Sequence, residues 1–236
     1  SLTTVTMGAD CQLTDIGRYA FAVESGTSKL TSLTLGPNVK NILAYAFYKS
    51  KVTNTLTIPK SVERIEDRAF QSANIKQLIF EAGGTAPLTM EGKYTFGSNA
   101  NLTKVVFPAR LTVAYKTENW HNDTVKTFVY HFTGTAKLVN VEMEAGSAHF
   151  KSIDGVLYEL DEEGKPSILL FCPSGKTGDF IVPKEVRKVE NGAFNQTQLT
   201  RILFEEYDKN DPNYGKALLE LGAGELTDAT VGTLGD

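Results

Sequence analysis

A short pattern recurs along this chain, and it constrains the fold more than any other feature of the sequence. The pattern consists of an apolar–polar–apolar triplet, a proline, two spaced aliphatic residues and the pair Ala-Phe. Three clear copies are residues 30–47 (LTSLTLGPNVKNILAYAF), 52–70 (VTNTLTIPKSVERIEDRAF) and 179–194 (DFIVPKEVRKVENGAF). Because one such unit cannot bury both of its apolar sides alone, repetition of this kind predicts a solenoid of stacked units.

The first apolar residue of each triplet is an anchor by which the units can be followed. Most successive anchors are 22 to 28 residues apart, within or close to the period of about 20–29 residues of leucine-rich repeats. Another aliphatic residue precedes most anchors by three positions, as Leu30 precedes Leu33, which gives the form L-x-x-L-x-L. The anchors are Val5, Leu33, Leu56, Leu78, Val105, Phe128, Val141, Phe180 and Ile202.

Each copy has the chemistry of a strand followed by a turn. In residues 33–35 (LTL) the alternation sends two side chains inward and one outward. Pro59 and its equivalents cannot donate to a ladder of hydrogen bonds, so they end the strand. Two aliphatic residues, such as Val62 and Ile65, then follow at helical or turn spacing and lead to Ala-Phe on the opposite wall. We therefore predict an α/β repeat fold, a right-handed solenoid with a stacked parallel sheet on one face and short helices or turns on the other.

The consensus L-T-x-[LV]-x-[IL]-P-x-x-V-x-x-I-x-x-x-A-F resembles the BspA-like class of leucine-rich repeats over about residues 2–204. The sequence departs from the class in two ways. Ala-Phe is missing after Val105, and Ser50 and Ala73 stand where the class often has cysteine. The resemblance implies a bacterial, secreted or surface-anchored protein that binds a host or bacterial partner.

Two segments between the regular units resemble further parts of that class. Residues 150–158 (FKSIDGVLY) and 172–177 (CPSGKT) resemble its β-hairpin insertion. Within it we predict arms at 156–160 and 168–171 around a turn at 161–165, so the hairpin lies near 155–171. The second segment resembles the short helix that often closes a block of repeats. It contains Phe107, Pro108, Tyr115, Lys116 and Trp120.

The spacing of the anchors predicts how the chain is organised. The step from Phe128 to Val141 is too short for a whole unit, so we expect a boundary between two blocks of repeats there. The prediction is one solenoid over residues 1–236 with sub-blocks at 1–130 and 131–204. Residues 205–236 then form a partial repeat, with the pattern resuming near 231, or an irregular end.

Composition and charge exclude several classes of function. The formal net charge of −4 gives no electrostatic indication of binding to nucleic acid or to an anionic membrane. No apolar run approaches the roughly 18 residues of a membrane span, and no signal peptide is visible. Because the chain starts at Ser1, we expect a processed or truncated product. Cys11 and Cys172 are too few for a disulfide scaffold, and we expect small buried or semi-buried side chains.

No motif for catalysis, cofactor binding or metal binding is convincing. Residues 174–177 (SGKT) resemble the end of a phosphate-binding loop, but Leu170 stands where its first glycine belongs. No two histidines have a zinc-ligand spacing, and neighbouring carboxylates are more typical of a solvated face. We therefore expect no cofactor and no enzymatic activity. The groups considered are His121, His131, His149, Glu162, Glu163, Glu205, Glu206 and Asp208–Asp211.

The outward position of each strand is the candidate binding surface. It is threonine in the first units and then becomes apolar, broken by one glutamate, and an apolar stripe on a sheet is a candidate contact surface. Two alternatives are that the hairpin or closing segment covers it and that β-branched residues are simply favoured there. The candidate residues are Ile79, Val106, Val129, Glu142, Ile181 and Leu203. A second recurring position, two residues before the repeat phenylalanine, holds Tyr19, Tyr45 and Tyr94, which we expect to pack the outer wall.

We consider four functions for this chain. The first is a non-catalytic surface protein that binds or adheres to a host or bacterial macromolecule, a protein in the first instance. The second is a glycan-binding module, which exposed Tyr48, Tyr130 or Trp120 would favour. The third is a structural spacer within a longer surface protein. The fourth, an enzyme, requires convergent carboxylates or a nucleophile in a cleft, and the sequence shows no such arrangement.

Overall fold

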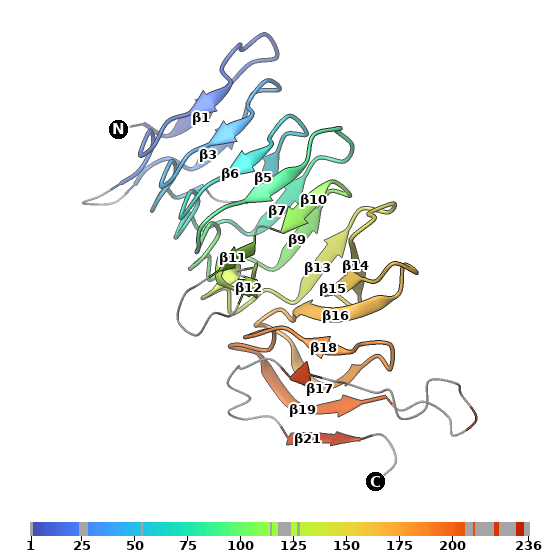
Figure 1. The fold of residues 1–236 in the computed structure, drawn as a ribbon. Coiled ribbons are helices and arrows are strands. Elements are labelled where there is room, and N and C mark those ends of the chain that lie inside the picture. Colours follow the sequence, from blue (N-terminus) through green and yellow to red (C-terminus); the bar gives the residue numbers. More distant parts are fainter. Residues whose placement is uncertain are drawn as a thin grey trace.

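The computed structural model describes residues 2–23, 28–52, 54–113, 115–117, 124–126, 128–205, 210, 220–221 and 230–233. The chain winds into a solenoid, in which the strands follow one another along one axis from β1 to β21 (Figure 1). Each regular turn has three walls, because the chain changes direction after the strand, after the spaced aliphatic residues and after Ala-Phe.

The first wall is the predicted parallel sheet. Its central part contains β5, β7, β9 and β13, whose register aligns the anchors Leu56, Leu78, Val105 and Val141. These anchors are fully buried, as the alternation predicts. The strands of this wall are β1 (Thr4–Thr6), β3 (Ser32–Thr34), β5 (Thr55–Ile58), β7 (Gln77–Phe80), β9 (Lys104–Phe107), β13 (Asn140–Met143), β17 (Thr177–Val182), β19 (Gln198–Phe204) and β21 (Thr230–Thr233).

The second wall is also a parallel sheet, made of very short strands. It begins where the spaced aliphatic residues return, so that Val62 and Ile65 are both fully buried. Strand order is β10-β8-β6-β4-β2. The strands are β2 (Asp15–Ile16), β4 (Asn41–Ile42), β6 (Arg64–Ile65), β8 (Leu88–Met90) and β10 (Leu111–Val113).

The third wall consists of turns, which is one of the two alternatives predicted for this side. The other alternative, short helices, and with it the α/β class, is not supported. The backbone N–H of Phe47 donates to the carbonyl of Ala69 on the next turn, and that of Phe70 donates to Thr95. Tyr45 and its equivalents have a positive φ, which a right-handed helix cannot contain. Within the described residues the only helix is η1 (Phe128–Phe132), a short 3-10 helix.

A column of stacked phenylalanine rings fills the centre of the solenoid behind the third wall. Neighbouring ring centroids are 5.0–5.8 Å apart, and the planes are within 27° of parallel. Each turn contributes one ring, so the stacking of turns creates the core. The column contains Phe21, Phe47, Phe70, Phe96, Phe132 and Phe171.

Two predictions around residue 130 are wrong. Phe128 is no strand anchor, because it lies in η1, which buries its ring and delivers Phe132 to the column. The expected helix near residue 115 is instead an antiparallel pair, β11 (Tyr115–Thr117) with β12 (Thr124–Lys126); Trp120 lies outside the described residues. The first-wall sheet continues past this region through β9 and β13. The sub-block boundary near 130 stays a prediction.

The predicted hairpin is present and has a third strand. β15 (Val156–Leu160) and β16 (Pro166–Phe171) are antiparallel, and β14 (Phe150–Ile153) pairs with the other edge of β15. β16 then pairs in parallel with β18 (Lys188–Val189), which pairs with β20 (Glu220–Leu221). The insertion therefore becomes part of the second wall and lies between two sections of the first-wall sheet.

Candidate binding surfaces

The outer face of the first-wall sheet carries an apolar pair. Ile79 on β7 and Val106 on β9 are register partners, so their side chains lie next to each other, and both are half-buried. Thr57 pairs with Ile79 on one side, and Glu142 pairs with Val106 on the other. The four residues form one row across four strands.

Glu142 is held in place by its neighbours. Its carboxylate lies 2.8 Å from Lys104 Nζ and accepts a hydrogen bond of 2.8 Å from Asn140. The hydrogen bond from Lys104 lowers the pKa of Glu142, although burial opposes this. Because both side chains are more than a third exposed, the ion pair contributes little to stability. The ion pair of Lys104 with Glu142 therefore places two charges at fixed positions beside Ile79 and Val106.

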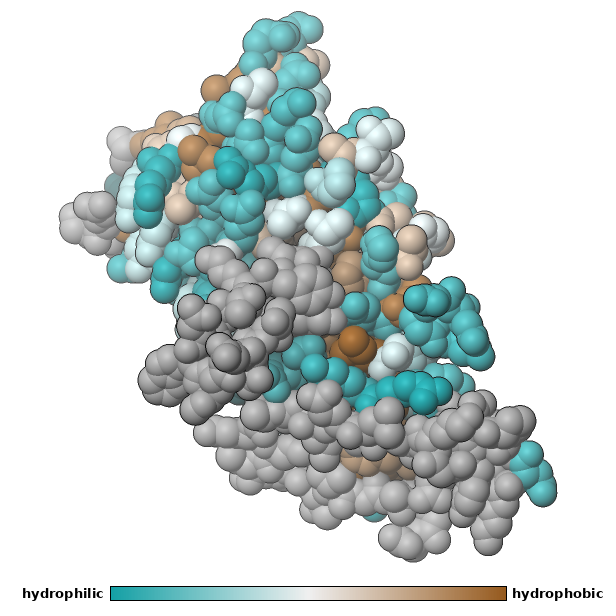
Figure 2. Space-filling view, in the orientation of Figure 1, coloured by the Kyte–Doolittle hydropathy of each residue, from teal (hydrophilic) through white to brown (hydrophobic). Residues whose placement is uncertain are grey.

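The remaining candidate residues do not extend this row. Val129 was predicted to point outward, and this is wrong, because it lies in η1 and is 5% exposed. Ile181 and Leu203 are register partners on β17 and β19, in a separate sheet beyond the insertion. Ile181 is 49% exposed. The sequence-predicted stripe is thus two separate apolar pairs, and the face seen in Figure 2 shows apolar residues as small patches among hydrophilic ones.

The outer side of the third wall carries a column of tyrosine and arginine. Tyr19 stacks on Tyr45 with ring centroids 4.8 Å apart. The guanidinium of Arg68, from the next turn, lies 5.6 Å from the ring of Tyr45 and 5.1 Å from that of Tyr94. On the turn after Tyr94, Tyr130 occupies the same position. The expectation that these tyrosines pack the outer wall is confirmed, and arginine takes the same position in the middle of the column.

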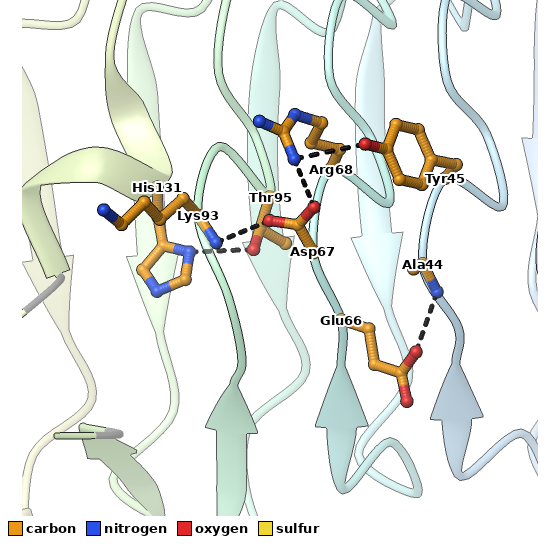
Figure 3. A network of polar contacts seen from close by, with 8 residues as sticks. All are labelled: Ala44, Tyr45, Glu66, Asp67, Arg68, Lys93, Thr95 and His131. Carbon is orange, nitrogen blue, oxygen red and sulfur yellow. Dashed lines mark hydrogen bonds and ion pairs between the residues drawn. The ribbon is translucent and has the colours of Figure 1, made fainter. Parts of the chain in front are cut away.

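A carboxylate fixes the arginine of this column (Figure 3). Arg68 donates to Asp67 at 2.5 Å and to the hydroxyl of Tyr45 at 3.1 Å. The other oxygen of Asp67 accepts from the backbone N–H of Lys93 at 2.7 Å. The sequence shows that Arg68 aligns with the tyrosines, but its stacking depends on the separation of the turns, which only the structure shows.

Two of the three histidines lie in the described part of the chain, and they have different surroundings. His131 is buried, and its Nδ1 lies 2.8 Å from the hydroxyl of Thr95 (Figure 3). Burial lowers the pKa of His131 to about 4, so the ring is neutral at physiological pH. His149 is exposed, and His121 lies outside the described residues. Across the described residues no group of three or more His, Cys, Asp or Glu side chains is arranged to hold a metal ion.

The residues that resembled a phosphate-binding loop have a structural role. Ser174 is buried and donates to the carbonyl of Thr135 at 2.8 Å. The N–H of Gly175 donates to Leu138 at 2.8 Å. These bonds join the turn after the insertion to the turn before it. Cys172 is buried, which raises its pKa to about 12, and Cys11 is half-buried, so both cysteines match the sequence prediction.

Gly175→Ala is expected to lower the free energy of unfolding by about 1–3 kcal/mol. An added Cβ would lie 2.7 Å from the carbonyl oxygen of Leu138 and 2.9 Å from the carbonyl carbon of Lys137, and backbone at that distance must shift. Urea denaturation monitored by circular dichroism measures the change. Gly17→Ala is the control, because its Cβ meets nothing within 4 Å. Equal stability of the two variants would contradict the assigned role of Gly175.

Comparison with known proteins identifies the repeat. The model of the BspA type leucine-rich repeat region matches residues 1–123 in six copies, which is more than half of the chain. The chain belongs to the BspA-type leucine-rich-repeat family. A search of curated protein sequences gives no significant match. In the described part of this BspA-type chain, no helix has the length and apolar character needed to cross a bilayer.

Solved structures with the same fold come from bacteria. A leucine-rich cell surface protein of Faecalibacterium prausnitzii is 22% identical and superposes with a TM-score of 0.63 over 97% of this chain and 54% of its own. The pneumococcal vaccine antigen PcpA is 21% identical, with a TM-score of 0.53 over 93% of this chain and 56% of its own. A leucine-rich repeat protein of Eubacterium ventriosum is 15% identical, with a TM-score of 0.51 over 86% of this chain and 60% of its own. The BspA-type chain thus spans little more than half the length of these structures.

Proposed function

We propose that this BspA-type chain is a non-catalytic module on the outside of a bacterial cell and that it binds a protein partner. Membership of the family supports a binding role. One structural relative is described as a leucine-rich cell surface protein and another as a vaccine antigen, which supports an extracellular location. The outer face of the first-wall sheet is the proposed contact surface.

The apolar pair of Ile79 and Val106 is the observation that carries this proposal. A parallel sheet is rigid, and the register fixes these side chains side by side. The module therefore loses little conformational freedom when a partner binds. Small apolar areas surrounded by polar groups are typical of the centre of protein interfaces. The ion pair of Lys104 with Glu142 lies at the edge, where charges direct orientation and association rate.

The chemistry of the described residues supports a non-catalytic role. The most strongly perturbed groups are His131, Cys172 and Tyr158, and all three are buried in the wall or the core. Their pKa values depart from ordinary values mainly because of burial.

The double variant Ile79→Lys with Val106→Lys is expected to weaken binding to a protein partner by about a hundredfold or more, because two charges would be desolvated in the contact. The purified chain is first screened against a panel of host extracellular-matrix proteins by biolayer interferometry. The variant is then measured against each protein that binds.

Thr89→Lys with Thr112→Lys is the matched control. These two residues are also register partners on neighbouring strands, but they lie on the second wall. We expect this control to bind as the unmodified chain does, and circular dichroism checks that both variants are folded. Unchanged binding by the first-wall variant would exclude this face. Absence of any protein ligand would favour the structural spacer.

A further inference from the structure

Two polar grooves lie at the corner between the third wall and the first. One has a volume of about 490 Å³ and is lined by Ser28, Lys49, Lys51, Ser72, Asn74, Ser98 and Ala100. The other has a volume of about 410 Å³ and is lined by Asn54, Thr55, Lys76, Gln77, Asn101, Thr103 and Lys137. Both linings draw on several successive turns, so the grooves run along the solenoid.

A hydrogen-bonded chain of side chains joins the two grooves. Asn101 donates to Asn74 at 2.9 Å, which connects the lining of one groove with that of the other. Lys137 Nζ donates to the other polar atom of the Asn101 amide, its Oδ1, at 3.0 Å. The grooves therefore share a border of amides and belong to one continuous polar surface, which we name the corner surface.

The charge on the corner surface is opposite in sign to that of the whole chain. The charged side chains among its described residues are four lysines, and all four are exposed. Among the described residues, neither lining contains a carboxylate, although the chain has a formal net charge of −4. A local excess of four positive charges on an acidic protein favours an anionic ligand at this place.

The neutral side chains of the corner surface narrow the choice of ligand. Hydroxyl and amide groups line both grooves, and each of them can donate and accept hydrogen bonds. Acidic side chains of a peptide or the phosphates of a polymer need donors only. Sugar hydroxyls need both donors and acceptors. The combination of lysines with hydroxyls and amides matches a ligand that carries both anionic groups and hydroxyls.

The backbone holds these side chains at a regular spacing. Lys49, Ser72 and Ser98 are equivalent positions of successive turns, and all three have φ between 55° and 57°. The N–H of Lys49 donates to Gln71 and that of Ser72 to Gly97, so each position is tied to the next turn. Turns in hydrogen-bonded contact are separated by about 4.8 Å, close to the advance per sugar in an extended glycan.

We propose that the corner surface binds an acidic polysaccharide that lies along the solenoid axis. Its sulfate or carboxylate groups pair with Lys49, Lys51, Lys76 and Lys137, and its hydroxyls bond to the serines and asparagines between them. The corner surface borders the outer face of the first-wall sheet through Thr55 on β5 and Gln77 on β7, but its four lysines lie outside those strands. The proposal therefore does not depend on the protein-binding role proposed for Ile79 and Val106.

The test measures binding of the full chain to immobilised heparin and to immobilised hyaluronan, which distinguishes sulfate from carboxylate groups. One variant carries Lys49→Gln, Lys51→Gln, Lys76→Gln and Lys137→Gln. We expect it to bind the polysaccharide that the unmodified chain binds about ten to a hundred times more weakly. A second variant, Ser72→Ala with Ser98→Ala, keeps every charge and is expected to weaken polysaccharide binding while leaving any binding of poly-glutamate unchanged.

A matched control carries the same change of charge elsewhere. Lys40→Gln, Lys60→Gln, Lys151→Gln and Lys165→Gln also take the formal net charge from −4 to −8, and none of these lysines lines either groove. We expect this control to bind as the unmodified chain does. Equal loss in both quadruple variants would show a nonspecific charge effect and overturn the site. Binding of poly-glutamate as tight as that of the polysaccharides, or binding of neither polysaccharide, would also overturn it.

Discussion

Phe70→Ala is expected to lower the free energy of unfolding by about 3–5 kcal/mol. The ring of Phe70 is fully buried and stacks between Phe47 and Phe96, with centroid distances of 5.0 and 5.4 Å. Its removal leaves a cavity in the middle of the column and takes away both stacked contacts. Because turns of a solenoid are stabilised by their neighbours, the loss affects the turns on both sides. Urea denaturation followed by circular dichroism measures the change.

Phe21→Ala provides the comparison at the end of the same column. Phe21 stacks on Phe47 at 5.1 Å, but it is only partly buried and has a stacked partner on one side. We expect a clearly smaller loss of stability, because solvent already reaches the site. Equal losses for the two variants would contradict the idea that the column stabilises each ring from both sides.

The stability of the chain is expected to fall between pH 6.5 and pH 4 because of His131. Burial lowers the pKa of His131 to about 4 in the folded chain, whereas the unfolded chain has the ordinary value of about 6.5. Between these values the unfolded state binds the extra proton, so stability is lost as the pH falls through this range and the loss is complete below pH 4. The difference of about 2.5 pH units corresponds to about 3 kcal/mol.

His131→Ala separates this effect from the titration of carboxylates. Alanine is the residue that Ala46 and Ala69 place at the equivalent position of earlier turns, so the variant fits the repeat. The free energy of unfolding is measured for both chains at pH 7.5, 6, 5 and 4. We expect the variant to lose less stability than the unmodified chain as the pH falls. Parallel curves for the two chains would contradict the burial of a neutral His131.

The repeat made much of the fold predictable, because each anchor was identified by local chemistry. Alternation at residues 33–35 predicted which side chains are buried, and Pro59 predicted where a strand ends; both are confirmed. The hairpin was predicted from the resemblance to the insertion of the family, and its arms were placed by a turn between two apolar segments; β15 and β16 confirm it. These features depend on residues that are close in sequence, so a single sequence contains the information.

The errors arose where apolar spacing had more than one structural solution. Phe128 and Val129 had the spacing of a strand, but the chain forms η1 there because Phe132 must reach the column of rings. Val62 and Ile65 had helical spacing, yet Val62 precedes the short strand β6 and Ile65 lies in it.

The side chain three residues after the repeat phenylalanine makes different hydrogen bonds in different turns. Ser50 bonds to the carbonyl of Phe47, whereas Asn99 bonds to Phe70 and Phe96 and accepts from Ile75.

The sequence by itself determined that the chain is a repeat of stacked strands and turns with apolar residues buried between its walls, because periodic apolar residues can be buried only by stacking. Tertiary structure decided which outward residues meet. The register of β7 and β9 brings Ile79 to Val106, and the separation of turns brings Arg68 between two tyrosines. It also gathered Lys49, Lys51, Lys76 and Lys137 at one corner. Residues on successive turns are about 20 or more positions apart, so only the winding of the chain brings them together.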